Sequence, residues 1–198
     1  TMGHGIHQFD LLLAVLGPWE EVAAMAARQD RPTDTEDVSM AVLRTEGGAL
    51  VSVVNSVVSP RESSELRFDT EHATVELRHL YGYTEDSWTF TPAPGHEHLL
   101  ARWQDPAATW PESGHTAQVA RLVAAVRDGG DLPVPLAEAR DTLELVAATY
   151  ASAFTGRRVR RGDIGPGHPF YDRMDGTGAP WPPVKAPGAA RSGQGVGA

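Results

Sequence analysis

The length and composition of the chain indicate one globular domain, because 198 residues that are 41% hydrophobic can bury a sizeable core. The formal net charge of −9 repels phosphate backbones and anionic membranes, so we expect neither nucleic acid nor a membrane as a partner. The absence of cysteine excludes disulfides and thiolate metal sites, and it suits a cytoplasmic location.

The first predicted element is an apolar helix over residues 6–16. Gly17 is a suitable C-terminal cap, and Pro18 cannot continue a helix. Two histidines and an aspartate crowd its N-terminus in the sequence GHGIHQFD, where Ser, Thr or Asn would be the ordinary choice. This crowding makes the start of the helix the first candidate site.

Strand patterns fill the middle of the chain. Residues 19–28 fit either a helix or a strand, and their short length favours a strand. Two β-branched runs, residues 37–45 and 49–59, flank Gly47 and Gly48, a pair that tolerates the positive φ of a hairpin turn. A second meander is predicted from the segments SSELRFD, ATVELRHLY and SWTFT.

The strand over residues 49–58 is apolar on both faces. One face carries Val51, Val53 and Val57, and the other carries Leu50, Val54 and Val58. Helices can cover only one of these faces. We therefore expect a homodimer or a higher homo-oligomer that forms through the other face of the sheet.

The C-terminal half returns to helix after a long loop over residues 92–113. The segments HTAQVARLVAAVRDGG and PLAEARDTLELVAATYASAFTG each carry an apolar stripe and end at glycine. From residue 161 onward Gly and Pro dominate, so we expect residues 161–198 to form a tail that is loose or draped over another surface. This order predicts an α+β domain over residues 1–160, with an open, mostly antiparallel sheet and helices on one face.

The motif GxHxxDLLxxxxG, the Gly-Gly hairpin and the late segment LPVPLAEARDTLELVAATYASAFTGRRV together resemble the C-terminal domain of the Gfo/Idh/MocA oxidoreductases. This is the glucose-fructose oxidoreductase and inositol dehydrogenase family, and the likeness spans about residues 1–159. The resemblance implies a preceding Rossmann domain that binds NAD or NADP. It also implies that the sheet of the C-terminal domain closes over the nicotinamide and forms a subunit interface.

The resemblance carries over to two positions of this sequence, and neighbouring residues add two further candidates. His7 falls on the catalytic histidine of the family, and Asp10 on the acid that follows it three residues later. We expect Asp10 to lie in the first turn of the helix, to turn back toward that helix and to act as a structural, orienting group. His4 is adjacent and would line the approach of the substrate. Tyr83 would line a sugar site, or else pack at the edge of the core. The family often has Asp or Asn four residues before its histidine, whereas this chain has Gly3, which removes a group that would orient substrate hydroxyls.

The sequence shows neither a dinucleotide cradle nor a metal-binding pattern. The segment GHGIHQ begins like GxGxxG, but Gln8 stands at its sixth position and no strand precedes it. We expect NAD or NADP to bind the complete protein and not this chain alone. His96 and His98 alternate on the long loop, but their spacing matches no zinc site, so we predict no metal.

Two functions from different classes fit these residues. The first is the substrate-binding and oligomerisation domain of a longer NAD(P)-dependent oxidoreductase that acts on a sugar, a cyclitol or a related hydroxy compound. In it, His7 exchanges the hydroxyl proton while hydride passes between the substrate and the nicotinamide. The second is a cofactor-free scaffold or assembly module that has lost the chemistry. His7 favours the enzyme, and Gly3 favours the scaffold.

Overall fold

The computed structural model describes residues 2–3, 5–78, 84–105 and 114–184. These residues form two compact units. Unit 1 combines residues 1–59 with residues 140–198, and unit 2 comprises residues 60–139. The candidate site lies in unit 1.

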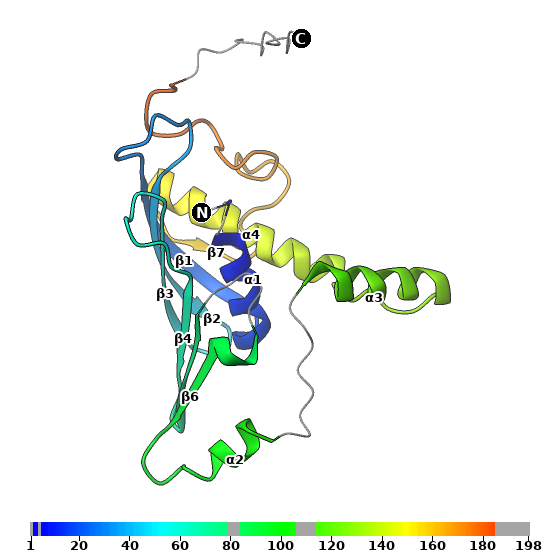
Figure 1. Cartoon of the computed structure of the whole chain (residues 1–198). Helices are drawn as coiled ribbons and strands as arrows, with labels where there is room; N and C mark the ends of the chain where they lie inside the picture. The colour runs from blue at the N-terminus through cyan, green and yellow to red at the C-terminus, as the bar shows by residue number, and fades with distance from the viewer. Residues whose placement is uncertain (1, 4, 79–83, 106–113, 185–198) are drawn as a thin grey trace, which may run out of the picture. The chain divides into compact units, whose positions relative to one another are not determined.

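Unit 1 is built on a four-stranded sheet. Its strands are β1 (Trp19–Ala27), β2 (Val38–Thr45), β3 (Leu50–Ser56) and β7 (Val159–Arg160), in the order β3-β2-β1-β7. Each neighbouring pair is antiparallel (Figure 1). The predicted turn between β2 and β3 is confirmed, since Gly48 has a φ of 85° and donates its backbone N–H to the carbonyl of Thr45.

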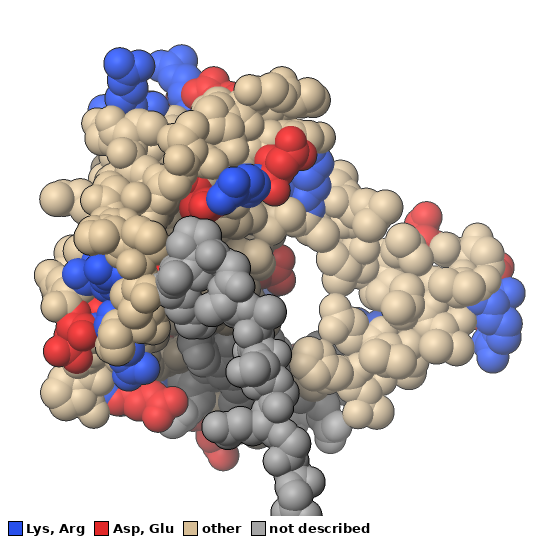
Figure 2. Space-filling model, turned by 90° about the horizontal axis from the view of Figure 1, so that it is seen from above, with Lys and Arg blue, Asp and Glu red and all other residues tan. Residues whose placement is uncertain are grey.

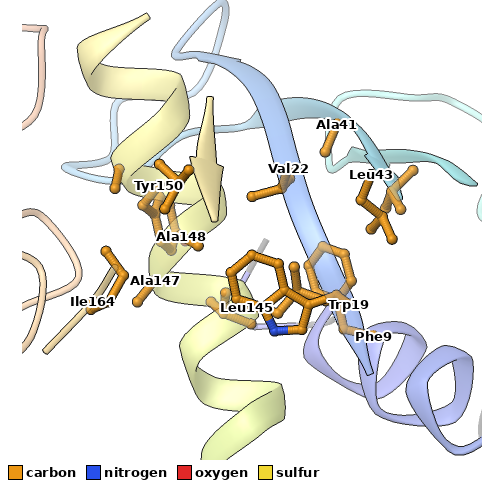
Figure 3. Close-up of a cluster of buried hydrophobic side chains, with 14 of the residues drawn as sticks. Phe9, Trp19, Val22, Ala41, Leu43, Leu145, Ala147, Ala148, Tyr150 and Ile164 are labelled. Carbon is orange, nitrogen blue, oxygen red and sulfur yellow. The ribbon is translucent and has the colours of Figure 1, made fainter. Parts of the chain in front are cut away.

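Two helices cover one face of this sheet, which we call the inner face. They are α1 (Gly5–Leu16) and α4 (Leu136–Thr155). The prediction of a helix that ends at Gly17 is confirmed, because Gly17 has a φ of 78° and donates to the carbonyl of Leu13. Figure 3 shows the buried cluster that joins the helices to the sheet, with side chains that include Phe9, Trp19 and Leu145.

The outer face of the same sheet is apolar and exposed. Met25 on β1 lies opposite Met40 on β2, and Met40 lies opposite Val54 on β3. These three side chains are 79%, 54% and 63% exposed, and Val42 and Leu50 are exposed beside them. Strand β3 is therefore apolar on both faces, and the described part of the chain covers only the inner face.

The described part of unit 2 contains a three-stranded antiparallel sheet, one short 3₁₀ helix and two α-helices. Its elements are β4 (Glu65–Asp69), β5 (Ala73–Arg78), the short helix η1 (Glu85–Ser87), β6 (Trp88–Pro92), α2 (Leu99–Trp103) and α3 (His115–Asp128). Trp103 of α2 stacks on Phe90 of β6, with ring centroids 5.0 Å apart. The segment over residues 92–113 that we predicted as a loop thus contains the helix α2. The contact between Trp103 and Phe90 stabilises this helix against strand β6.

The α+β class is confirmed, with antiparallel pairing and helices on one face of the sheet in unit 1. Within the described residues, no parallel strand–helix–strand unit of the Rossmann type occurs. The strands divide between two sheets, whereas we expected one open sheet. The described part of the chain has no helix with the length and apolarity needed to cross a membrane.

Residues that follow α4 pack against unit 1. Ile164 and Phe170 are buried in its core. Further along, Trp181 donates its indole N–H to the carbonyl of Asp34, at 3.1 Å, in the loop between β1 and β2. Residues 161–184 therefore pack against unit 1 and contribute to its core. The predicted boundary at residue 160 stays a prediction, and residues 185–198 lie outside the described residues.

The loop between β1 and β2 is held by the buried carboxylate of Asp37. Its two oxygens accept the backbone N–H groups of Gln29, Asp30 and Arg31 at 2.7, 2.7 and 2.9 Å. These backbone hydrogen bonds, the strongest of them from Asp30, lower the pKa of Asp37 to about 2. The ionised carboxylate thus organises the loop that receives the indole of Trp181.

Replacing Asp37 by asparagine will lower the thermal midpoint of unfolding at pH 7. The NH2 group of asparagine cannot accept a hydrogen bond, so it would face backbone N–H groups that now donate to a carboxylate oxygen. The folded pKa lies below the ordinary value of 3.8, so the ionised group stabilises the fold above pH 3.8 and loses this effect as the pH falls through about 2. Unfolding followed by circular dichroism from pH 7 to pH 2 will show the difference between Asp37→Asn and wild type shrinking. Asp30→Asn is the matched control, because that exposed side chain leaves its backbone N–H in place.

Candidate functional site at the start of α1

The first turn of α1 lies directly on the sheet. Gly5 is buried, and a Cβ placed there would come within 2.8 to 3.0 Å of the amide group of Asn55 on β3. A larger residue at position 5 would thus force the amide group of Asn55 to move. Phe9 and Leu12 continue the buried side of the helix into the core.

His7 lies on the opposite side of the helix. Two residues along an α-helix correspond to a rotation of about 200°, so a buried Gly5 turns His7 away from the sheet. His7 is accordingly exposed. An imidazole in the first turn of a helix, with its side chain directed away from the core, is accessible to a molecule that approaches the helix side of unit 1.

Asp10 joins α1 to α4. It lies in the second turn of the helix, whereas we expected the first, and its Oδ1 accepts the hydroxyl of Thr142 at 3.0 Å. We expected Asp10 to turn back toward its own helix, but its observed partner is on a neighbouring helix. The bond fixes α1 relative to α4, and the role of Asp10 in orienting His7 stays a prediction.

A buried polar contact also holds the segment that enters α1. The hydroxyl of Tyr150 on α4 donates to Glu36 Oε1 at 2.8 Å and accepts the backbone N–H of Met2 at 3.2 Å. Sequence reasoning missed this contact because Tyr150 falls on the apolar stripe of its helix and Glu36 in an acidic loop. No local pattern relates two residues so far apart in the sequence.

Gly3 is exposed, and no atom lies within 4 Å of a Cβ built on it. The fold therefore leaves room for a side chain at this position, and the departure from the Asp or Asn of the family does not follow from packing. His4 and Tyr83, which we expected near the substrate, lie outside the described residues.

Three further histidines lie together in unit 2. In unit 2, His72 and His96 stack with ring centroids 4.2 Å apart, and His98 lies 6.0 Å from His96. Within the residues described, no three His, Cys, Asp or Glu side chains come together in a way that could hold a metal ion. His115 is the first residue of α3.

A shallow depression lies on the outer face of the sheet in unit 1, away from His7. Val42 and Leu50 contribute to its wall. At its edge, Glu21 forms ion pairs with Arg158 at 3.0 Å and with Arg44 at 3.8 Å. Because these side chains point away from α1 and α4, the depression belongs to the outer face and not to the site at α1.

The N-terminal part of the chain, which carries the site at α1, is similar to a known protein family. Residues 1–77, which include α1 and the first three strands, match the family model described as the GFO/IDH/MocA C-terminal domain. Residues 1–77 are thus similar to the GFO/IDH/MocA C-terminal domain. The resemblance inferred from the motif around His7 is confirmed.

Solved structures of oxidoreductases share the fold over a larger part of the chain. The WlbA dehydrogenase from Bordetella pertussis, in complex with NADH and UDP-GlcNAcA, is 23% identical with a TM-score of 0.66; the match covers 80% of this chain and 45% of that one. The aldose-aldose oxidoreductase from Caulobacter crescentus, complexed with glycerol, is 21% identical with a TM-score of 0.61, covering 79% and 45%.

A third structure agrees with these two. An oxidoreductase from Agrobacterium radiobacter, in complex with NAD+, L-tartaric acid and magnesium, is 22% identical with a TM-score of 0.59, and the match covers 82% of this chain and 49% of that one. The chain thus spans about half the length of the solved structures that it matches. No curated protein matches it in sequence.

Proposed function

We propose that this chain is the substrate-binding and oligomerisation domain of a longer NAD(P)-dependent oxidoreductase that acts on a sugar, a cyclitol or a related hydroxy compound. The observation that carries the proposal is the exposed His7 in the first turn of α1, within the residues that match the family model. We propose that His7 takes the place of the family's catalytic histidine. The structures with NADH or NAD+ support a nicotinamide cofactor, and we propose a cytoplasmic location from the lack of cysteine.

The dinucleotide itself requires residues beyond those described here. No glycine-rich turn between a strand and a helix occurs in the described part of unit 1, since α1 follows a turn and its glycine Gly5 is packed against Asn55. We therefore assign to the described part of this chain one contribution to the reaction, the imidazole of His7. When bound, the nicotinamide accepts or supplies the hydride.

The part of the reaction assigned to this chain is the movement of a proton. In the oxidation of an alcohol, the substrate O–H bond breaks and its proton passes to a ring nitrogen of His7. The electron pair of the O–H bond would form the carbonyl as the carbon that bears the oxygen gives up a hydride, for which a bound nicotinamide would be the acceptor. In the reverse direction His7 returns the proton to the carbonyl oxygen. The bond between Asp10 and Thr142 stabilises the helix on which His7 is held.

Oligomerisation is assigned to the outer face of the sheet in unit 1. Met25, Met40 and Val54 form a continuous apolar row across three strands, and Val42 and Leu50 enlarge it. Exposed apolar patches of this kind mark interaction surfaces. A flat sheet face can pair with itself about a two-fold axis, so we propose a second copy of this chain as its partner.

The alternative is a cofactor-free scaffold that uses the same outer face for assembly. The open space around Gly3 favours it, because a side chain that could orient a substrate would fit there and is absent. This alternative predicts association of the chain without any binding of a nicotinamide cofactor.

The two functions are separated by assays on the natural full-length polypeptide that contains this sequence. NADH and NADPH are titrated by fluorescence, and turnover is followed by nicotinamide absorbance with UDP-sugars, aldoses and cyclitols as separate panels. We expect one of the cofactors to bind and at least one panel to give turnover. A polypeptide that binds neither cofactor would contradict the oxidoreductase and support the scaffold.

A further inference from the structure

The hydroxyl of Tyr150 on α4 makes two contacts in the interior of unit 1. It donates to Glu36 Oε1 at 2.8 Å and accepts the backbone N–H of Met2 at 3.2 Å. Tyr150 is 6% and Glu36 9% exposed, so water competes little for these groups. Because Tyr150 falls on the apolar stripe of its helix, a phenylalanine would also suit the packing of the ring. The hydroxyl thus adds contacts that core packing does not require.

The contact with Met2 lies just before α1. The N–H groups of the first turn of a helix have no partners within the helix, and helix ends fray. His7 is an exposed residue of this first turn. If the segment before α1 were not held, fraying of the first turn would move the imidazole of His7. The bond from Met2 to Tyr150 restricts this motion.

Helix α4 also holds α1 on the other side of His7 in the sequence. There Asp10 Oδ1 accepts the hydroxyl of Thr142 at 3.0 Å. Thr142 and Tyr150 are about two turns apart on α4, which is about 12 Å along its axis. His7 therefore lies between two residues that contact the same helix, one through its backbone and one through its side chain.

Glu36 belongs to a loop that is itself held in place. The neighbouring carboxylate of Asp37 accepts three backbone N–H groups of this loop between β1 and β2. Asp34 accepts the indole N–H of Trp181 through its carbonyl, and the backbone N–H of Val184 through Oδ1 at 2.7 Å. Figure 1 shows the segment after α4, in orange, beside this loop. Glu36 is thus a fixed acceptor for the hydroxyl of Tyr150.

The described surface at this end of unit 1 does not point to a charged ligand. Figure 2 views the molecule from this end, and the acidic and basic side chains on the visible surface lie beside one another. A patch of one charge would favour a ligand of the opposite charge. We therefore assign to the segment that carries Trp181 the support of the loop.

We propose that Tyr150 and Glu36 are positioning residues for His7; this inference rests on the proposed function. Glu36 accepts the hydroxyl hydrogen of Tyr150, which leaves a lone pair of the hydroxyl oxygen for the N–H of Met2. Neither residue touches the substrate in this proposal, and both act through the backbone that leads into α1. Their effect matters because a general base must lie about 2.6–3.2 Å from the group whose proton it takes.

A double-mutant cycle in the natural full-length polypeptide tests the proposal. Tyr150→Phe removes the hydroxyl and keeps the ring, whose centroid lies 5.8 Å from that of Phe154. We expect this variant to lower kcat about tenfold without changing the KM for the nicotinamide cofactor. In a His7→Ala background we expect it to lower kcat no further, because it acts through His7. Tyr171→Phe is the matched control and should behave like the wild type, since Tyr171 is 46% exposed in the same unit.

Substitutions of Glu36 provide a second test. Glu36→Gln keeps a carbonyl oxygen that accepts the hydroxyl of Tyr150, so we expect it to retain kcat within about twofold, whereas Glu36→Ala should lower kcat about as much as Tyr150→Phe. Hydrogen exchange of peptides that cover residues 1–9 provides a readout that needs no turnover. We expect faster exchange in Tyr150→Phe and Glu36→Ala, and exchange like that of the wild type in Glu36→Gln.

Two results would overturn the inference while the proposed function stands. One is a loss of kcat from Tyr150→Phe that is equally large in the His7→Ala background, and the other is unchanged exchange of residues 1–9 in both Tyr150→Phe and Glu36→Ala. If Tyr150→Phe does not fold, equal kcat values for Glu36→Gln and Glu36→Ala overturn it instead. If the polypeptide binds no cofactor, or if His7→Ala turns over like the wild type, the proposed function itself fails and the inference fails with it.

Discussion

Replacing His7 by alanine or asparagine in the full-length enzyme will lower kcat by about 10² to 10⁴ while leaving cofactor affinity little changed. This is the ordinary cost of removing a positioned acid–base group. Cofactor affinity is spared because the described part of this chain offers no dinucleotide cradle. The exposed position of His7, opposite the buried Gly5, means that the substitution removes no core contact.

The measurement is steady-state turnover with the substrate found in the panels, combined with thermal unfolding of each variant. A surface substitution of this kind should change the free energy of unfolding by no more than about 0.5 kcal/mol. His96→Ala is the matched control, because His96 lies in unit 2 and stacks on His72 far from α1 in sequence. Near-normal turnover of the His7 variants would remove the main support for the oxidoreductase.

Replacing Met40 by aspartate will dissociate the proposed homo-oligomer. Met40 lies at the centre of the exposed row, opposite Met25 on one side and Val54 on the other. In a two-fold interface the substitution occurs twice, and each carboxylate would be buried among apolar side chains without a partner. A penalty of about 2.8 kcal/mol already raises the dissociation constant about 100-fold.

Sedimentation velocity over a range of protein concentrations measures this effect. Glu20→Ala on β1 is a suitable control, since Glu20 is an exposed residue of the same sheet outside the apolar row. We expect the control to associate like the wild type and Met40→Asp to sediment as a monomer. If the wild type is monomeric at tens of micromolar protein, the proposed oligomerisation through the outer face is wrong. Weak dimers are detected at concentrations of about this order.

The elements that could be predicted from the sequence are those with local signals. Gly17 and Pro18 end α1 because one residue adopts positive φ and the other lacks an N–H. Gly47 and Gly48 mark the hairpin of β2 and β3 for a similar reason. The resemblance to a family, and a histidine in the first turn of α1, also followed from a short motif, because the spacing of residues along one helix is a local property.

Other features depend on residues that are distant in the sequence, and only the tertiary structure decided them. The partner of Asp10 is Thr142, and the partner of Glu36 is Tyr150, which no periodicity relates. The division of the strands between two sheets likewise depends on which strand edges form hydrogen bonds with each other, and local sequence patterns do not specify that pairing.

The amino-acid sequence by itself determined which faces are apolar: both faces of β3, and the stripe of α3 that includes Leu122. Periodicity is a property of the chain, so it can be read without coordinates. Only the tertiary structure decided which of those faces are covered. The inner face of β3 is buried under α1 and α4, whereas Val54 and Leu122 are exposed. Whether an apolar face is buried depends on whether another segment, domain or copy packs against it. An apolar pattern alone does not specify that partner.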